Sequence, residues 1–379
     1  VCLSAYWILV ANAWMQYPVG MEFDPAQMRN VMVSFADVAL SPVAVNKFFH
    51  TVLSGWVLGA VFVVGVSCWF LYKKSNISLA KDSMKVASWV GLAGIVLTIW
   101  TGDGSAVQVA KVQPMKLAAM EGLYDGSRGQ SLVAFGIINP SKERTDDKPA
   151  ILGEIAIPKG LSILANHDAD SFVPGINDLI NGVSVNAQGD TVNTVSYAER
   201  IERGRAAQEA LRRYEAAMKA NDTAAMQAAE ADIKADFQFF GYGFLDSVDE
   251  AVPPVALTFY AFRVMVMGGG YLLLFFVVML FLCYRMEKGW VIFFGLLTIP
   301  VVWLVSEAGW VTAEMGRQPW TIEGLLPTRA AISAISAGSV QLTFWMFVVV
   351  FIGLLVAEVS IMTREITKAS RRDILADND

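Results

Sequence analysis

Two carboxylates and two tryptophans share one face of an apolar segment near the carboxyl end of the chain. Residues 303–320 read WLVSEAGWVTAEMGRQPW. At 3.6 residues per turn, four side chains fall within roughly 60° of one another: Trp303, Glu307, Trp310 and Glu314. The preceding residues 290–305 are almost wholly apolar, so a helix would carry both carboxylates into or near a membrane. A carboxylate there costs about 2.5 to 3.5 kcal/mol and is normally paired, protonated or bound to a cation or metal.

The exit from this segment allows two interpretations. Arg317 and the turn-forming pair Gln318-Pro319 follow Glu314 directly. In the first interpretation, Glu314 pairs with Arg317 one turn later and only anchors the helix end. In the second, the carboxylate binds a cation, a metal or protons within the membrane. The segment alone leaves both open.

His50 lies near the start of another apolar run and is a candidate haem ligand. Ser54 follows on its helix face, and Gly55 and Gly59 lie slightly off that face. Small residues allow a flat ring system to approach a helix backbone, and a neutral imidazole at membrane depth is a common haem ligand. The alternative is a core histidine that hydrogen-bonds a neighbouring helix. The other histidine, His167, lies in a polar region and is expected at the surface.

A third apolar run contains FRVMVMGGG and carries Arg263 and Met265. Arg263 has no acidic neighbour on its own helix, so we expect an anionic partner from another segment. A methionine in such a run is usually packing material. However, Met265 and His50 are predicted at comparable depth. A His/Met pair from two helices would hold a low-spin haem of raised potential, with Arg263 available to a propionate.

Further polar side chains lie at the ends of apolar runs or inside them. Lys116 and Glu121 are five residues apart, so they do not share one helix face. They either face a polar ligand at the membrane surface or form a solvated charge pair. Glu358 and Asn12 would serve a proton path or hydrogen bonds within a helix bundle.

The composition is that of a polytopic membrane protein. The chain has 379 residues, of which 55% are hydrophobic and 17% charged, and its mean hydropathy is +0.47. The net charge of -6 argues against nucleic-acid binding. Cys2, Cys68 and Cys283 lie in apolar runs without CxxC spacing. They are expected to be core cysteines rather than disulfide, zinc or covalent haem sites.

The apolar runs predict an all-α transmembrane bundle with a large extramembrane helical loop. About six spans are expected: 1 to 15, 47–72, 84–101, 253–284, 290–313 and 340–362. The third span is expected to end at Gly102-Asp103-Gly104. Three parts result: membrane helices over 1–102, the loop over 103–252, and membrane helices with a tail over 253–379. Within the loop, residues 197–237 have the composition of surface helices, with a break at Asn221-Asp222.

Basic residues predict the orientation of the spans. They occur at alternate span ends: Lys73, Lys74, Lys81, Lys85, Arg285, Lys288, Arg364, Lys368, Arg371 and Arg372. The positive-inside tendency makes that side cytoplasmic. The loop and the GRQPW segment are therefore predicted to lie outside.

Together, these motifs resemble subunit I of the cytochrome bd-type quinol oxidases. The resemblance covers essentially the whole chain in the same order: NAWMQYPVG, KFFHTVLSGW, KLAAMEG, YAFRVMV, EAGWVTAEMGRQPW and LLPT. By this resemblance, His50 and Met265 are the axial ligands of a low-spin haem b, with Arg263 near it. Glu314 corresponds to the carboxylate ligand of a high-spin haem b, and Trp310 to the tryptophan between the haems.

The same resemblance implies a quinol site and an activity. Lys116 and Glu121 match quinol-site residues at the start of the family's extracytoplasmic loop, residues 103–252 resemble the long form of that loop, and Arg317 is the arginine of GRQPW. Ubiquinol or menaquinol would be oxidised outside. Electrons would pass through the b haems to haem d, where dioxygen becomes water, and a membrane potential would form without pumping.

The resemblance also implies a location and partners. The protein would lie in a bacterial inner membrane, in contact with lipid, with a second large subunit (subunit II) and a small single-helix accessory subunit. The family has further N-terminal helices that bear the ligand of another high-spin haem. No segment of this sequence corresponds to those helices, and the sequence starts at Val1 in the middle of an apolar span. We therefore expect a truncated sequence of a longer protein.

Two other function classes remain open on the residues alone. A membrane cytochrome could carry electrons from quinol to a partner without reducing oxygen, but Glu314 and Trp310 favour the oxidase. A transporter would use charged side chains as an ion path: Arg263, Glu307, Glu314 and Glu358. No inverted repeat supports it, and the His/Met pair would be unexplained.

Overall fold

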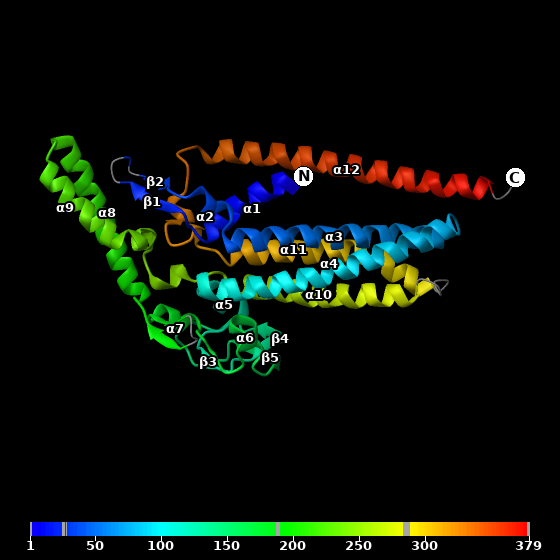
Figure 1. The fold of residues 1–379 in the computed structure, drawn as a ribbon, viewed down its shortest axis with the longest axis horizontal. Coiled ribbons are helices and arrows are strands. Elements are labelled where there is room, and N and C mark those ends of the chain that lie inside the picture. The colour runs from blue at the N-terminus through cyan, green and yellow to red at the C-terminus, as the bar shows by residue number, and fades with distance from the viewer. Residues whose placement is uncertain (1, 25–26, 28, 187–189, 283–288, 377–379) are drawn as a thin grey trace. The chain divides into compact units, whose positions relative to one another are not determined.

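The protein is a predominantly helical polytopic membrane protein, as its composition predicts. The computed structural model describes residues 2–24, 27, 29–186, 190–282 and 289–376 (Figure 1). Within these residues, five helices are long and apolar enough to cross a membrane. They are α3 (Pro42–Tyr72), α4 (Ile77–Val112), α10 (Val255–Leu282), α11 (Gly289–Met315) and α12 (Ala337–Ala376).

The first of the expected spans, which was expected to be incomplete, is not among these five. Helix α1 (Cys2–Gln16) has 15 residues, which rise about 22 Å at 1.5 Å per residue. A helix that crosses a bilayer needs about 20 apolar residues. The described residues therefore contain five candidate spans instead of about six.

Helix α4 does not end at Gly102-Asp103-Gly104, so that prediction is wrong. The helix continues to Val112. A Cβ atom on Gly102 would lie 3.4 Å from His50 Cε1, and one on Gly104 would lie 3.4 Å from Asn46 Oδ1. The two glycines therefore lie inside the helix, at the contact between α4 and α3.

The described chain forms two compact units, and four of the long helices contribute to both. Unit 1 comprises Val1–Val52, Leu97–Met267 and Val305–Ala331, and unit 2 comprises Leu53–Val96, Gly268–Leu304 and Ile332–Asp379. All the candidate haem and quinol residues belong to unit 1.

Close helix contacts in unit 2 depend on glycine. A Cβ atom on Gly91 would lie 2.1 Å from the Phe276 ring, and one on Gly295 would lie 2.3 Å from Cys68 Sγ. Small residues allow such approach between membrane helices. Cys68 is buried, as predicted for a core cysteine, whereas Cys2 is exposed. Cys283 lies outside the described residues.

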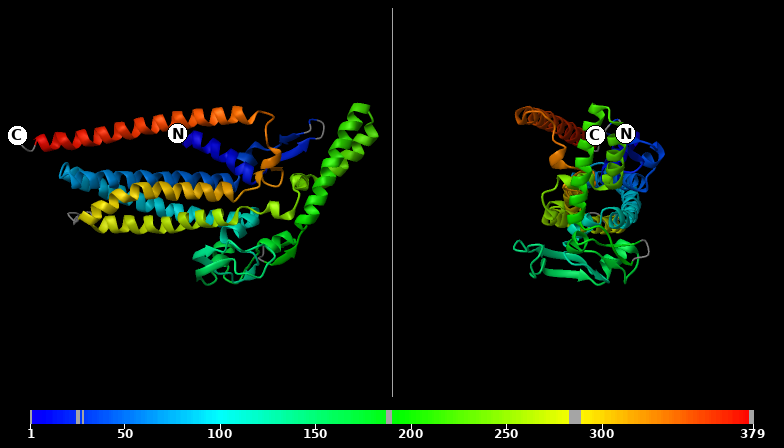
Figure 2. Two further views of the ribbon diagram at one scale, coloured as in Figure 1. Left: turned by 180° about the vertical axis from the view of Figure 1, so that it is seen from behind. Right: turned by 90° about the vertical axis from the view of Figure 1, so that its left-hand side faces the viewer.

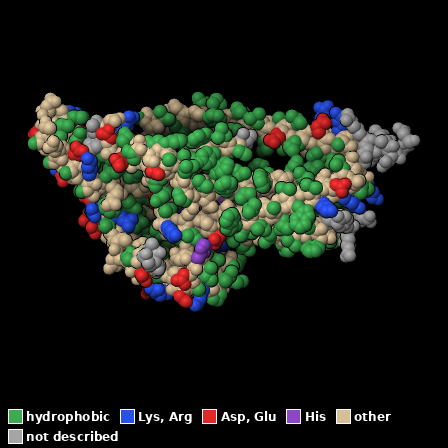
Figure 3. All heavy atoms as spheres, viewed as in Figure 1, with side chains coloured by type: hydrophobic (Ala, Val, Ile, Leu, Met, Phe, Trp, Pro, Cys, Tyr) green, Lys and Arg blue, Asp and Glu red, His purple; other side chains and the backbone are tan. Residues whose placement is uncertain are grey.

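The basic residues expected on one side do gather at one end of unit 2. Ser75 Oγ, in the α3–α4 turn, lies 2.7 Å from Ser370 Oγ near the end of α12. Figure 3 shows Lys and Arg side chains at this end. Arg285 and Lys288 lie outside the described residues, as does the side chain of Arg372. That this end faces the cytoplasm remains a prediction.

The extramembrane loop contains helices, as expected, and in addition short strands that the sequence did not predict. Its helices are α5 (Pro114–Glu121), α6 (Gly160–Asn166), α7 (Ile176–Ile180), α8 (Tyr197–Ala220) and α9 (Thr223–Asp236). Three antiparallel strand pairs accompany them: β3 (Ser127–Arg128) with β6 (Phe172–Val173), β4 (Leu132–Ile138) with β5 (Ile151–Ile157), and β7 (Val183–Val185) with β8 (Thr191–Asn193). Their apolar, β-branched residues favour strands.

Three smaller elements complete unit 1. Strands β1 (Met21–Asp24) and β2 (Arg29–Met32) pair before the short helix α2 (Phe35–Ala39). Strands β9 (Trp320–Ile322) and β10 (Leu326–Pro327) pair after α11. Short 3-10 helices follow α9, over Phe237–Phe244 and Val248–Ala251, and β10, over Thr328–Ala330.

The two surface helices of the loop form as predicted. Asn221, with φ of 53°, caps the C-terminus of α8, and Asp222 caps the N-terminus of α9, where its side chain accepts a hydrogen bond from Ala225 N. Figure 2 shows α8 and α9 as an antiparallel pair. Ala210, Tyr214, Ala229 and Ile233 form the buried seam between them.

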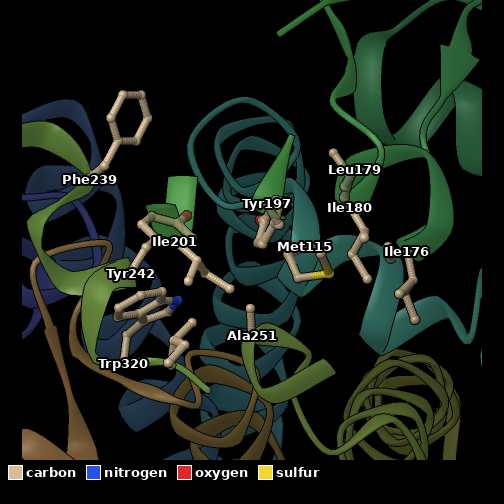
Figure 4. Close-up of a cluster of buried hydrophobic side chains, with 12 residues drawn as sticks. Met115, Ile176, Leu179, Ile180, Tyr197, Ile201, Phe239, Tyr242, Ala251 and Trp320 are labelled. Carbon is tan, nitrogen blue, oxygen red and sulfur yellow. The ribbon is translucent and has the colours of Figure 1, made fainter. Parts of the chain in front are cut away.

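A buried apolar cluster joins the loop to the GRQPW segment (Figure 4). It draws on α5, α7, α8 and β9: Met115, Ala118, Ile176, Leu179, Ile180, Tyr197, Ile201, Phe239, Tyr242, Leu245, Ala251 and Trp320. Trp320 is 4% exposed, and its ring centroid lies 4.8 Å from that of Tyr242. The cluster therefore fixes α5 against the chain that leaves α11.

Glycine at position 91 is expected to be essential for packing in unit 2. Gly91→Ala should lower the thermal midpoint by a few degrees, because overpacking costs about 1 to 3 kcal/mol. The matched control is Gly353→Ala on α12, where a Cβ would meet nothing within 4 Å. Thermal unfolding in detergent measures both. Equal midpoints for the two variants would contradict the packing argument.

Candidate functional site

Helix α5 holds two opposite charges inside unit 1. Lys116 is 5% exposed and Glu121 is 3% exposed, so the expectation of a solvated charge pair is wrong. Pro114 starts the helix, where its missing N–H costs nothing. Gly122 ends it with φ of 62°. As their spacing predicts, Lys116 and Glu121 do not pair with each other but have separate partners.

Glu121 is the anionic partner that the sequence predicted for Arg263. Arg263 Nη2 lies 2.6 Å from Glu121 Oε2 and donates to Val133 O at 2.9 Å. The guanidinium also bonds Met120 O and lies 3.7 Å from the ring centroid of Phe259. Burial raises the pKa of Glu121 to about 7, although the Arg263 charge opposes this shift.

Each member of this ion pair keeps one unsatisfied atom. Glu121 Oε1 and Arg263 Nε are buried and have no hydrogen-bond partner among the described residues. Leaving a buried polar atom unpaired costs about 1 to 3 kcal/mol. The two atoms are therefore suited to a further ligand: Nε to a carboxylate such as a haem propionate, and Oε1 to a hydroxyl.

Lys116 contacts α11 on the opposite side of α5. Its Nζ donates to Ala313 O at 3.0 Å and to Gln16 Oε1 at 3.2 Å. Gln113, one turn earlier, donates to Glu323 Oε2 at 3.0 Å. Burial lowers the pKa of Lys116 to about 8, while Glu323 and Glu314 oppose the shift. Burial likewise raises the pKa of Glu323 to about 7.

Glu314 is engaged through both of its oxygens. Oε2 lies 2.5 Å from Arg317 Nη2, so the pair anticipated at the helix end does form. Oε1 accepts a hydrogen bond from Asn12 Nδ2 at 2.8 Å, and Lys47 bonds the other end of the Asn12 amide. A carboxylate has about four lone-pair positions, so these bonds orient Glu314 and still leave it able to bind a metal.

The sequence candidates did not include several members of this network: Gln16, Lys47, Gln113 and Glu323. Lys47 could have been found, because it is a charged residue three positions before His50 in an apolar run. Gln16, Gln113 and Glu323 lie in ordinary polar contexts. Only their contacts with distant segments in the folded protein identify these three residues as members of the network.

His50 is held by α4 and keeps a nitrogen suited to a metal. Its Nδ1 lies 3.1 Å from Thr101 Oγ1, and that hydroxyl donates its proton to carbonyl oxygens of its own helix, Leu97 O at 3.0 Å among them. In the tautomer in which Nδ1 donates to Thr101 Oγ1, the lone pair is on Nε2. The predicted bond to a neighbouring helix is thus present, and metal-ligating histidines are oriented in this way.

Met265 lies against α11, whereas His50 lies against α4. A Cβ atom on Gly309 would be 3.2 Å from Met265 Sδ. An imidazole and a thioether on two helices of unit 1 are donor types that bind a haem iron. The described structure shows no direct contact between His50 and Met265.

The remaining candidates lie apart from these contacts. Trp310 is half-buried one turn before Glu314, while Glu307 and Glu358 are exposed. His167 is exposed, as predicted, and its Nε2 lies 2.9 Å from Asp103 Oδ2. Within the described ranges, no three His, Cys, Asp or Glu side chains form a metal site. A haem iron needs only one or two protein ligands.

Titration of Glu323 should make stability fall as pH rises. The folded protein holds this proton more tightly than the unfolded chain, so the contribution is complete below pH 4.5 and is lost through about pH 7. The loss is at most about 3 kcal/mol. In thermal unfolding across this pH range, Glu323→Gln should reduce the slope. The control variant Glu154→Gln, at an exposed site, should keep the wild-type slope. Equal slopes in the wild type and in both variants would refute the assignment of this pH dependence to Glu323.

Comparisons with known proteins agree over nearly the whole chain. The family model described as cytochrome bd terminal oxidase subunit I matches residues 1–370. Cytochrome bd-II ubiquinol oxidase subunit 1 of Escherichia coli (strain K12) is 35% identical, over 96% of this chain and 70% of that protein. Cytochrome bd ubiquinol oxidase subunit 1 of Bacillus subtilis (strain 168) is 28% identical, over 98% of this chain and 66% of that protein.

A solved structure shares the fold. The bd oxidase from Geobacillus thermodenitrificans matches with a TM-score of 0.70 at 22% identity, over 98% of this chain and 68% of that chain. The present chain thus spans about two thirds of the length of each of these proteins.

Proposed function

The chain belongs to the cytochrome bd terminal oxidase subunit I family, and we propose that it oxidises quinol and binds haem in a respiratory terminal oxidase. Dioxygen would be the final electron acceptor. Ubiquinol or menaquinol is the proposed substrate, since two relatives are named as ubiquinol oxidases. The resulting membrane potential would arise without proton pumping.

One observation carries this proposal: α5 links the quinol candidates to two of the three helices that bear haem-ligand candidates, α10 and α11. Glu121 binds Arg263, which lies two residues before Met265 on α10. Lys116 binds the carbonyl of Ala313, which directly precedes Glu314 on α11. A quinol held at α5 would therefore lie close to the groups that accept its electrons.

The charges on α5 suit a quinol, which must be held by its hydroxyls and lose two protons. Lys116 would donate a hydrogen bond to a quinol oxygen. Glu121, with Oε1 free of other partners in the described protein, would accept a quinol proton. Its pKa of about 7 suits a general base at neutral pH. Arg263 would stabilise the carboxylate in its charged form.

The haem-ligand roles follow the chemistry of the donor atoms. His50 and Met265 would ligate the iron of a low-spin haem b, and Arg263 Nε would bind a propionate. Glu314 would ligate a high-spin haem b, held in position by Asn12 and Arg317. Trp310 would lie between the haems. When bound, these haems and a haem d would carry electrons from quinol to dioxygen.

The cellular setting follows from the family. We place the protein in the bacterial inner membrane, with the loop between α4 and α10 on the outer side, as the basic residues predict. A second large subunit is the expected partner, together with a small accessory helix and lipid. The transporter alternative is weaker, because Arg263 is neutralised by Glu121, while Glu307 and Glu358 are exposed.

The function is tested by difference spectra of membranes that contain the full-length protein, with and without carbon monoxide. Low-spin b bands with a CO-sensitive chlorin band in the red, together with quinol-dependent oxygen uptake, are expected. Low-spin bands without any CO-sensitive species would indicate an electron-transfer cytochrome instead. Spectra without haem bands would refute the proposal.

Replacing Met265 should remove one axial ligand of the low-spin haem. Met265→Leu should convert this haem to a high-spin or depleted form, because leucine keeps the volume but has no donor atom. Visible and electron paramagnetic resonance spectra measure the change. Met267→Leu, exposed two residues later, is the control and should leave the spectrum unaltered. An unchanged low-spin signal in Met265→Leu would remove Met265 from the ligand set.

Replacing Lys116 should weaken quinol oxidation while the haems stay in place. Lys116→Ala should lower kcat/KM for quinol about 10- to 100-fold, since a hydrogen bond from a charged group contributes about 1.5 to 3 kcal/mol. Oxygen uptake with added quinol measures this, and the difference spectrum checks haem content. The control is Lys111→Ala, at an exposed site on α4. Wild-type quinol kinetics in Lys116→Ala would exclude the proposed contact.

A further inference from the structure

The β4–β5 hairpin of the loop has one packed side and one bare apolar side. Its antiparallel register pairs Phe135 with Ile155 and Ile137 with Leu152. Both pairs point outward: Phe135 is 52%, Ile155 66% and Ile137 54% exposed. Successive residues of a strand face opposite sides of the sheet, so the hairpin can carry apolar side chains on both of its sides.

The packed side lies against the first turns of α10. Tyr260 Oη accepts a hydrogen bond from Ile138 N at 3.0 Å, and Arg263 Nη2 donates to Val133 O at 2.9 Å. A Cβ atom on Gly122 would lie 3.1 Å from Ile138 Cδ1 and 3.4 Å from the Phe259 ring. These contacts all lie within unit 1, so they fix the hairpin relative to this part of α10.

This position sets the depth of the hairpin. Helix α10 has 28 residues, or about 42 Å, whereas the hydrocarbon core is about 30 Å thick. Tyr260 and Arg263 lie in its first nine residues, near one boundary of that core. Leu257 and Val264, on the same turns of α10, are 47% and 48% exposed. Exposed apolar side chains therefore occur both on the hairpin and on this part of α10.

Composition argues against contact with water or with a charged partner. The fourteen residues of β4 and β5 include one charged side chain, Glu154. Leu152 and Ile157 extend the bare apolar surface and are 42% and 53% exposed. Contiguous exposed apolar surface of this kind marks a protein or membrane contact. Figure 3 shows hydrophobic side chains on this part of the molecule.

We propose that the bare side of the β4–β5 hairpin is embedded in the outer interfacial layer of the lipid bilayer. The backbone edges of a two-stranded hairpin cannot enter hydrocarbon unpaired, so the strands lie at headgroup level and their side chains reach the acyl chains. Val133 O binds the same guanidinium as Glu121. The hairpin thus forms a lipid-facing surface beside the proposed quinol site. A membrane-soluble quinol would reach the site from this side.

Nitroxide quenching tests this placement in the full-length oxidase in nanodiscs. The native cysteines are replaced, and a fluorophore is attached at Ile155→Cys or, as the matched control on the opposite side, at Glu154→Cys. With a nitroxide near the top of the lipid acyl chain, quenching at 155 should exceed that at 154 at least twofold. A label at Phe135→Cys should behave like the one at 155, which guards against local misfolding.

Equal quenching at 155 and 154, or none at 155 and 135, would overturn the proposal. The second outcome would mean that water or another protein chain covers this side. Quinol oxidation by each labelled protein confirms that it is folded. Because the readout is lipid proximity, a failure here leaves the proposed quinol activity to be judged by its own assays.

Discussion

The need to neutralise one guanidinium inside an apolar helix organises much of unit 1. Arg263 has no acidic residue within reach on α10, and an unpaired charge there is strongly unfavourable. Its partners come from two other places: Glu121 at the end of α5, and Val133 in β4. The ion pair and hydrogen bonds of Arg263 therefore fix α5 and the β4–β5 hairpin of the loop against α10. Breaking such a pair by removing one partner typically costs about 3 to 5 kcal/mol.

Helix α5, which carries Glu121, also positions polar groups on the side that contacts α11. Lys116 contacts the backbone of α11, and Gln113 connects to Glu323 in the turn after GRQPW. Their charges are buried, so desolvation moves the pKa of Lys116 down and those of Glu121 and Glu323 up, toward neutrality. Groups that titrate near pH 7 are suited to proton transfer. The apolar cluster around Met115 and Trp320 holds this helix in place.

Much of this architecture could be predicted from the sequence, and the failures have physical causes. Arg263 was expected to need an anion, and α8 and α9 were expected with their break at Asn221-Asp222. Gly102 and Gly104 were misjudged as a helix end, because their role as contact points is visible only with α3 beside them. The loop strands were missed because their apolar residues suit a buried helix as well as a strand.

The sequence by itself determined the class of the protein, the apolar spans and the residue types able to bind haem or quinol. These depend on composition and on local spacing, which a chain carries before it folds. Only the tertiary structure decided that Glu121 neutralises Arg263, that Asn12 and Lys47 support Glu314, and that Glu323 accepts a hydrogen bond from Gln113. Each of those contacts joins segments far apart in the chain, and their energies depend on burial and distance that no local pattern contains.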